Sequence, residues 1–196
     1  MVPVSLGRNA SWRKPLNLDH FRGYLLLLAR IHLNRKIQAK FDPSDIVQQT
    51  MLEAHEAIES FRGDNTAAQA AWLRQILARN LANAVRDLTR DKRDVNRERS
   101  IHADLDASSS RLEGWLAADQ SSPSEHAQRN ERVLLLAEAL TRLPEQQREA
   151  VILRHFHGSS LADIASELQT TTAAVTGLLH RGLKNLRTIL ADLESL

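Results

Sequence analysis

Apolar side chains recur at three- and four-residue spacing through most of the 196-residue chain, and the alternation typical of strands is almost absent. The spacing predicts helices over about 18–40, 43–60 and 66–93. Further helices are expected from Pro123, and from Leu143-Pro144 to Gly158, where glycine ends the pattern. The sequence therefore predicts an all-α protein.

The stretch from Ser160 to Leu190 has the layout of a helix-turn-helix. Ser160 and Asp163 form a capping pair before a short helix, Gln169 and Thr170 interrupt it, and a longer helix begins near Thr171. In a DNA-binding helix-turn-helix, the second helix presents its N-terminal residues to the major groove. Its polar residues would contact bases and phosphates: Thr171, Thr172, Thr176, His180, Arg181, Lys184 and Arg187. An ordinary helical hairpin would show a similar apolar pattern.

The helix predicted over 66–93 has an apolar face that includes Leu73, Leu77 and Leu81. The opposite face collects polar side chains without matching acids: Arg79, Asn83, Arg86, Arg90, Arg93 and Arg97. A solvated face usually mixes charge signs, so this arginine stripe favours contact with nucleic-acid phosphates. Trp72 lies on the same side, and the loop 61–65 precedes the helix, with Gly63 free to take positive φ.

Charge is distributed unevenly, although the net charge of the whole chain is only +2. Residues 1–92 carry 14 basic and 9 acidic residues, residues 93–127 carry 4 and 7, and residues 128–196 carry 8 of each. The acidic middle is rich in Ser, Asp and Ala, with Trp115 and Leu116 as isolated apolar anchors. We therefore predict two small helical domains joined by an acidic linker. The predicted boundaries are an N-terminal extension (1–17), a first domain (18–95), the linker (96–124) and a second domain with the helix-turn-helix (125–196).

Several function classes are disfavoured by composition. The chain has no cysteine, which excludes disulfides and Cys-based zinc sites and fits a cytoplasmic protein. The apolar run over 24–29 is too short to span a bilayer, and we expect no signal peptide. No Walker loop, HExxH motif or carboxylate pair is present, and His155 and His157 would point to different sides of a helix. We therefore expect no enzymatic activity, no metal and no cofactor.

Five segments together resemble a known family. In the first half they are SDIVQQTML (44–52), FRGD (61–64) and WLRQILARNLA (72–82). In the second half they are LPEQQREAV (143–151) and the helix-turn-helix. The first three resemble region 2 of bacterial RNA polymerase sigma factors, and the last two resemble region 4. Both blocks in this order, with a non-matching linker, resemble the extracytoplasmic-function (ECF) group of the sigma-seventy family.

This resemblance implies a role for each block. The polymerase-docking helix would use Asp45, Ile46, Gln48 and Gln49 against the clamp-helix coiled coil of the largest subunit. The loop that captures a flipped base of the minus-ten element would be Phe61, Arg62, Gly63, Asp64 and Asn65. The adjacent duplex and non-template strand would be held by Trp72, Arg79, Asn83, Arg86 and Arg90. The minus-thirty-five element would be read by Thr171, Thr172, Ala173, Thr176, His180, Arg181 and Lys184.

The implied partners are core RNA polymerase, promoter DNA and an anti-sigma factor, and the acidic linker would follow the RNA exit path. The sequence departs from the family at Gln49, where an acid is usual, and at Gln169, where glycine is common in the turn. Leu178 is expected to be exposed and to contact a partner such as the anti-sigma factor. The alternative function is a stand-alone helix-turn-helix regulator with a helical sensor domain, which would bind duplex DNA without polymerase.

Overall fold

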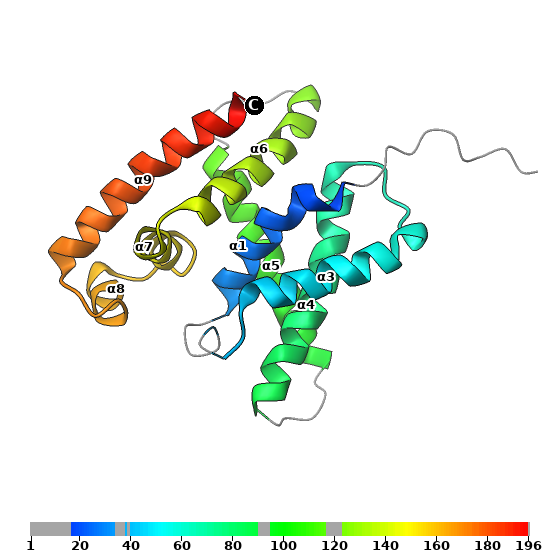
Figure 1. The fold of residues 1–196 in the computed structure, drawn as a ribbon, viewed down its shortest axis with the longest axis horizontal. Helices are drawn as coiled ribbons and strands as arrows, with labels where there is room; N and C mark the ends of the chain where they lie inside the picture. Colours follow the sequence, from blue (N-terminus) through cyan, green and yellow to red (C-terminus); the bar gives the residue numbers. More distant parts are fainter. Residues whose placement is uncertain (1–16, 34–37, 39, 90–94, 117–122, 196) are drawn as a thin grey trace, which may run out of the picture.

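A computed structural model describes residues 17–33, 38, 40–89, 95–116 and 123–195 (Figure 1). Within these ranges all regular structure is helical, which confirms the all-α prediction. The elements are η1 (Leu18–Phe21), α1 (Arg22–His32), α3 (Pro43–Glu56), η2 (Ile58–Ser60), α4 (Thr66–Thr89), α5 (Val95–Leu116), α6 (Pro123–Arg142), α7 (Glu145–His155), α8 (Leu161–Glu167) and α9 (Thr172–Glu194). Apart from Asn17, the predicted N-terminal extension lies outside the described residues.

Local sequence sets most helix starts. The Asp42 carboxylate accepts a hydrogen bond from the Ser44 backbone N–H at 2.8 Å, and Pro43 occupies the first helical position. Ser160 and Asp163 form the predicted capping box, and the Thr171 hydroxyl caps α9 by accepting from the Ala174 N–H at 3.2 Å. Asn65 caps α4 in the same way, because its Oδ1 accepts from the Ala68 N–H at 2.8 Å.

The first predicted helix is wrong in extent. It begins with the short η1 and its α-helical part ends at His32, not near Lys40. Leu33 leaves the helix with φ −90° and ψ 111°, which brings its side chain into the core. The Gln38 amide donates to the Leu33 carbonyl at 2.5 Å and to the Arg30 carbonyl at 3.1 Å. These bonds satisfy carbonyl groups that the end of α1 leaves free.

Residues 96–116, assigned to the linker by the sequence analysis, belong to helix α5, which packs against α1, α4 and α6. The linker prediction is wrong for this part, since Leu105 and Leu112 are fully buried. Ser109 is also buried and accepts a hydrogen bond from the Tyr24 hydroxyl at 2.9 Å. Because serine occupies some core-facing positions of α5, the apolar spacing typical of a helix is not evident in its sequence. The rest of the predicted linker, residues 117–122, lies outside the described residues.

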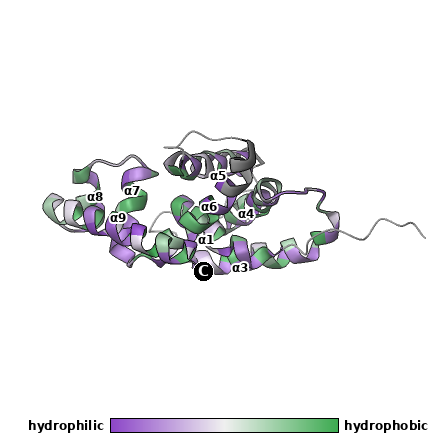
Figure 2. Cartoon of the chain, turned by 90° about the horizontal axis from the view of Figure 1, so that it is seen from above, coloured by the Kyte–Doolittle hydropathy of each residue, from purple (hydrophilic) through white to green (hydrophobic). Residues whose placement is uncertain are grey.

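Helix α1 occupies the centre of the molecule and contacts α3, α4, α5 and α6 (Figure 1). A continuous apolar core runs from α1 into α6, where Leu136, Ala137 and Leu140 are buried. A smaller apolar cluster joins α7, α8 and α9 around Ile164 and Val175. Both hydrophilic and hydrophobic positions follow one another along α3 and α9, as expected for helices with one buried side (Figure 2).

The turn of the helix-turn-helix places Gln169 at φ 52°, in the left-handed region that favours glycine. The next N–H, that of Thr170, reaches back to the Ala165 carbonyl at 2.8 Å, so the turn is closed by a backbone bond. The departure from glycine at this position therefore carries backbone strain.

Replacing Gln169 by glycine should stabilise the protein. The left-handed conformation costs a non-glycine residue about 1–2 kcal/mol. Glycine gives the unfolded chain more conformational freedom, which stabilises the unfolded state and offsets about 0.5–1 kcal/mol of that gain. We expect Gln169→Gly to raise the free energy of unfolding in urea by about 0.5–1 kcal/mol. Gln169→Ala keeps the strain and serves as the control, with no gain expected. A Gln169→Gly protein less stable than wild type would contradict this account.

Candidate nucleic-acid interface

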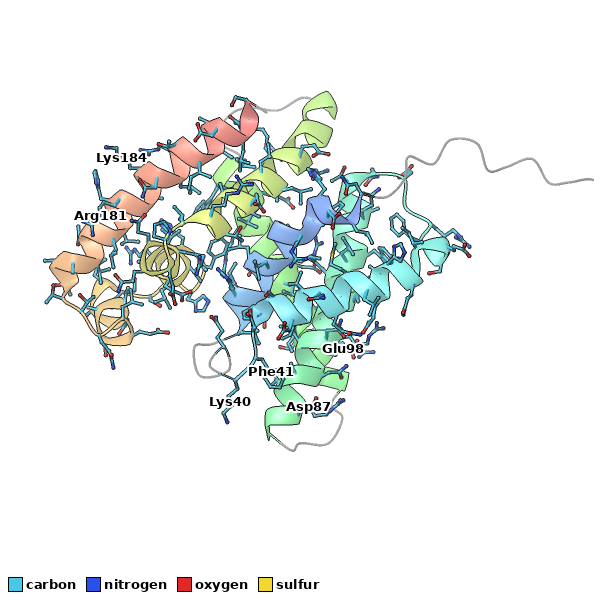
Figure 3. All side chains as sticks on the ribbon, viewed as in Figure 1. Lys40, Phe41, Asp87, Glu98, Arg181 and Lys184 are labelled. Atoms are coloured by element: carbon cyan, nitrogen blue, oxygen red, sulfur yellow. The ribbon has the colours of Figure 1, made fainter. Side chains whose placement is uncertain are left out.

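The outer side of α9 presents the predicted base- and phosphate-contacting residues. All seven are exposed: Thr171, Thr172, Ala173, Thr176, His180, Arg181 and Lys184. Val175 and Leu186 on the other side are buried, and α9 packs there against α6, α7 and α8. Figure 3 shows Arg181 and Lys184 projecting from α9 away from α7. The structure therefore brings these residues together on one rigid, solvent-facing surface.

Two glycines within α9 have structural uses. A Cβ on Gly182 would lie 3.2 Å from Val151 Cγ2, so glycine lets α9 approach α7 closely. The Arg181 guanidinium lies over Gly177, whose added Cβ would be 3.2 Å from Arg181 Nη1. Leu178 packs against the apolar cluster of α7, α8 and α9 and is only partly exposed. The prediction that Leu178 is exposed is therefore wrong, and its contact with a partner stays a prediction.

The α4 face is less uniform than the arginine stripe suggested. Arg79 is exposed but forms an ion pair with Glu53 of α3, so this stripe has a matching acid. Partial burial opposes ionisation of Glu53, but hydrogen bonds from Gln49 and Arg79 outweigh it and hold the pKa of Glu53 below its usual value. Asn83 and Arg86 are half-buried, and Arg86 Nε lies 3.7 Å from Asp87 Oδ1.

The other residues of the predicted arginine stripe are Arg90, Arg93 and Arg97. Arg90 and Arg93 lie outside the described residues, as does the side chain of Arg97. The structure therefore describes the predicted stripe only from Arg79 to Arg86, and there it places an acid beside Arg79.

The loop 61–65 divides into a buried and an exposed part. Phe61 is only 8% exposed, and its ring centroid lies 4.9 Å from that of Trp72. The sequence analysis predicts positive φ at Gly63, but the φ of Gly63 is not positive. Its glycine is needed for space, because an added Cβ would lie 2.2 Å from Phe61 Cζ. Phe61 thus belongs to the core, whereas Arg62, Asp64 and Asn65 are exposed.

The outer face of α3 exposes Asp45, Gln48 and Gln49, but Ile46 is only 7% exposed and points into the core. The assignment of Ile46 to a docking contact is therefore corrected. Sequence reasoning missed Leu52, which is 52% exposed and follows Asp45 and Gln48 on the same helix face. Its helical spacing of four and seven residues was the available signal.

Leu52 borders a shallow groove of about 450 Å³ between α3 and η1. Its lining is partly polar: Asn17, Leu18, Asp19, Gln48, Met51, Leu52 and His55.

The two histidines near the end of α7 contact different groups. His155 lies edge-on to Trp115, with ring centroids 4.9 Å apart, while His157 Nε2 lies 2.9 Å from the Ile31 carbonyl. Burial, followed by the charge of Arg154, lowers the pKa of His155. In the described part of the chain, no group of three or more His, Asp or Glu side chains could hold a metal ion. Among the same residues, no helix is long and apolar enough to cross a bilayer.

Comparison with known proteins gives matches to both halves of the chain. Residues 20–91 match the Sigma-70 region 2 family, and residues 134–186 match Sigma-70, region 4. The chain is 30% identical over 149 residues to the ECF RNA polymerase sigma factor SigL of Mycobacterium tuberculosis, covering 76% of this chain and 75% of that protein.

Two other relatives are similar over comparable lengths. The ECF RNA polymerase sigma factor SigG of Mycobacterium tuberculosis is 28% identical over 166 residues, which cover 81% of this chain and 44% of SigG. The RNA polymerase sigma-H factor of Pseudomonas aeruginosa is 29% identical over 142 residues, which cover 71% and 68%. Together with an all-α fold that carries an exposed helix-turn-helix, these matches show that the chain belongs to the ECF group of the sigma-70 family, whose members bind core RNA polymerase and direct it to promoters.

Proposed function

We propose that this sigma factor divides promoter recognition between its two halves, with residues 18–95 serving core polymerase and the minus-ten element and residues 125–196 serving the minus-thirty-five element. The observation that carries the proposal is the polar surface of α9, since six exposed side chains of this helix and its N-cap Thr171 lie together, and the helix is fixed by three neighbouring helices. In this proposal the protein acts in the cytoplasm by binding core polymerase and promoter DNA, and it catalyses no reaction. A stand-alone regulator is not favoured.

The first turns of α9 would read bases with small side chains. The hydroxyl and methyl groups of Thr171, Thr172, Ala173 and Thr176 suit single hydrogen bonds and thymine methyl contacts, not bidentate contacts to guanine. The basic residues His180, Arg181 and Lys184 come one to three turns later, where a helix leaving the groove meets phosphates. Because residues 128–196 carry no net charge, non-specific attraction to DNA is weak.

The minus-ten element would be held by the loop and α4. In this assignment Arg62, Asp64 and Asn65 face the extruded base, and the phosphate contacts come from Arg79, Asn83, Arg86 and Arg90. Trp72 is half-buried against Phe61, so the two rings support the loop, and Gly63 leaves room for the Phe61 ring. Phe61 itself is assigned to this support, since its ring is covered.

Core polymerase would dock on the outer face of α3. Asp45, Gln48 and Gln49 supply polar contacts, and exposed Leu52 adds an apolar contact at the edge of the groove. An anti-sigma factor is a further partner in this proposal.

The chain alone should bind promoter duplex weakly. We expect a dissociation constant for a minus-thirty-five duplex near the non-specific range of about 10⁻⁴ to 10⁻⁶ M at physiological salt. Core polymerase should strengthen binding greatly, because it holds the second half near its element at high effective concentration. Fluorescence anisotropy with and without core polymerase measures both values. Sequence-specific nanomolar binding by the chain alone would instead identify a self-sufficient regulator.

Charge reversal on α3 should weaken polymerase docking. Asp45 is exposed, so Asp45→Arg disturbs no buried side chain and loses only the favourable position of an acid in the first turn of α3, about 0.3–1 kcal/mol. The fold should therefore be retained. We expect affinity for core polymerase to fall by about tenfold or more, which corresponds to about 1.4 kcal/mol. A pull-down titration measures the change, with exposed Asp192→Arg at the far end of α9 as the matched control. Equal affinity of the two variants would remove Asp45 from the interface.

Loss of one stripe arginine should reduce the salt dependence of promoter binding. If Arg86 contacts a phosphate, Arg86→Ala should lower the slope of log K against log salt by roughly one unit and weaken all promoters alike. Arg132→Ala, which removes an exposed arginine of α6 paired with Glu194, is the control and should leave the slope unchanged. An effect confined to particular promoter sequences would indicate base readout by Arg86.

A further inference from the structure

Two neighbouring arginines have buried N–H groups without a partner. Arg30 lies in the last turn of α1, and Arg148 lies near the start of α7. Arg30 Nη1 and Arg148 Nε are both buried, and neither has a hydrogen-bond partner in the part of the chain that the structure describes. Because nearly all buried polar groups in proteins are hydrogen-bonded, two such exceptions side by side indicate the place of a bound ion.

The end of α1 does not supply the missing acceptor for Arg30. The Gln38 amide donates to the Arg30 and Leu33 carbonyls, and His157 Nε2 lies 2.9 Å from the Ile31 carbonyl. The carbonyl groups at this helix end are therefore already engaged. The helix dipole attracts a cation to the last turn, but that attraction provides no acceptor for a buried N–H group.

The positive charge of the two arginines is only partly balanced by the chain. Burial, followed by the charge of Arg30, lowers the pKa of Arg148, whereas Glu149 and Glu145 act in the opposite direction and each has less effect than Arg30. The stretch 34–40, which follows α1 in sequence, contains neither Asp nor Glu. Two like charges in a half-buried place repel each other, and an anion bound to both would replace that repulsion by attraction.

The arginine pair suits a phosphate group in shape and in charge. Arg148 is held in one orientation, because its Nη1 donates to the carbonyls of Thr141 at 3.2 Å and Leu143 at 3.0 Å, and a fixed guanidinium loses little freedom when it binds an anion. Both arginine side chains are half-buried, so part of each guanidinium is open to a ligand from solvent. Guanidinium groups match the oxygens of carboxylates and phosphates. Of these, a doubly charged phosphate balances both arginines, whereas a carboxylate balances one.

We propose that Arg30 and Arg148 form a binding site for a small phosphate dianion, either inorganic phosphate or the phosphate of a phosphate monoester, which would link α1 to α7. The site uses none of the residues assigned above to core polymerase or promoter DNA, so the inference goes beyond the proposed function and does not depend on it.

Thermal unfolding of the full chain tests this site. A ligand at ten times its dissociation constant should raise the melting temperature of a protein of this size by about 2–4 °C. Titrations with sodium phosphate and with adenosine monophosphate are compared with sodium chloride at equal pH and ionic strength. We expect a saturable rise with phosphate or the monophosphate and none with chloride, and the ligand that acts at the lower concentration identifies the source of the phosphate group. Equal shifts with all three salts would overturn the proposal.

The variant Arg30→Met separates binding at this site from general stabilisation by salt. Phosphate is excluded from protein surfaces and stabilises many folded proteins without a specific site, so the decisive quantity is the difference in shift between wild type and variant. Arg30→Met deletes one charge and keeps a long apolar side chain, so the fold should be retained. We expect it to lose the saturable shift, whereas exposed Arg22→Met, with the same charge change on the same helix, should keep it. Equal shifts in wild type and Arg30→Met would mean an adventitious ion only.

Side-chain NMR gives a second measurement that does not depend on stability. The Nε–H signal of Arg148 is identified by its loss in Arg148→Lys, and phosphate should move this signal in wild type along a saturable curve. A signal that stays in place throughout the phosphate titration would show that no anion meets this donor, and would overturn the proposal even if Arg30→Met failed to fold. Promoter binding with core polymerase is measured on wild type separately, so a failure of the proposed function is distinguishable from a failure of the phosphate site.

Discussion

The close packing of α6 on α1 is the constraint on which the rest of the structure depends. Gly23 removes the side chain that would otherwise separate the two helices, so their apolar faces meet and one core extends through both halves of the chain. The second half is thereby fixed on the first, because α9 and α7 follow α6. A contact between two helices far apart in sequence thus decides where the proposed DNA-reading surface lies.

Polar groups inside the first half hold α5 in place. The Arg74 guanidinium donates to Asp106 Oδ1 at 2.7 Å and to the Tyr24 hydroxyl at 2.8 Å, and that hydroxyl donates in turn to Ser109. Burial raises the pKa of Tyr24 in spite of the nearby arginine, so the phenol stays protonated and keeps its donor role. A network of this kind ties three helices together, and it is costly when only partly satisfied. This polar attachment distinguishes α5 from the leucine-rich α1 and α6.

The proposed binding surfaces share one physical plan. In α9 and α4 an apolar side is anchored in a core, and small polar or basic residues occupy the other side. The anchored side orders the backbone before any partner arrives, which reduces the entropy lost on binding. The ion pair between Arg79 and Glu53 opposes the proposed phosphate contact, because Arg79 must leave the Glu53 carboxylate on α3 before it can bind a phosphate.

Helix starts, the all-α class and the helix-turn-helix could be predicted from local sequence, because a cap such as Asp42 or Ser160 bonds to backbone only two or three residues away. The exposure of Thr172 and Lys184 followed from helical spacing for the same reason. Other features depend on partners distant in sequence. From the sequence alone, the serines of α5 resemble a linker, Phe61 resembles an exposed aromatic residue and Arg79 has no evident partner. In the structure the Tyr24 hydroxyl donates to Ser109, Trp72 and Gly63 lie against Phe61, and Glu53 of α3 pairs with Arg79. Those contacts exist only once the helices have packed, since no local pattern encodes which distant side chain will be their neighbour.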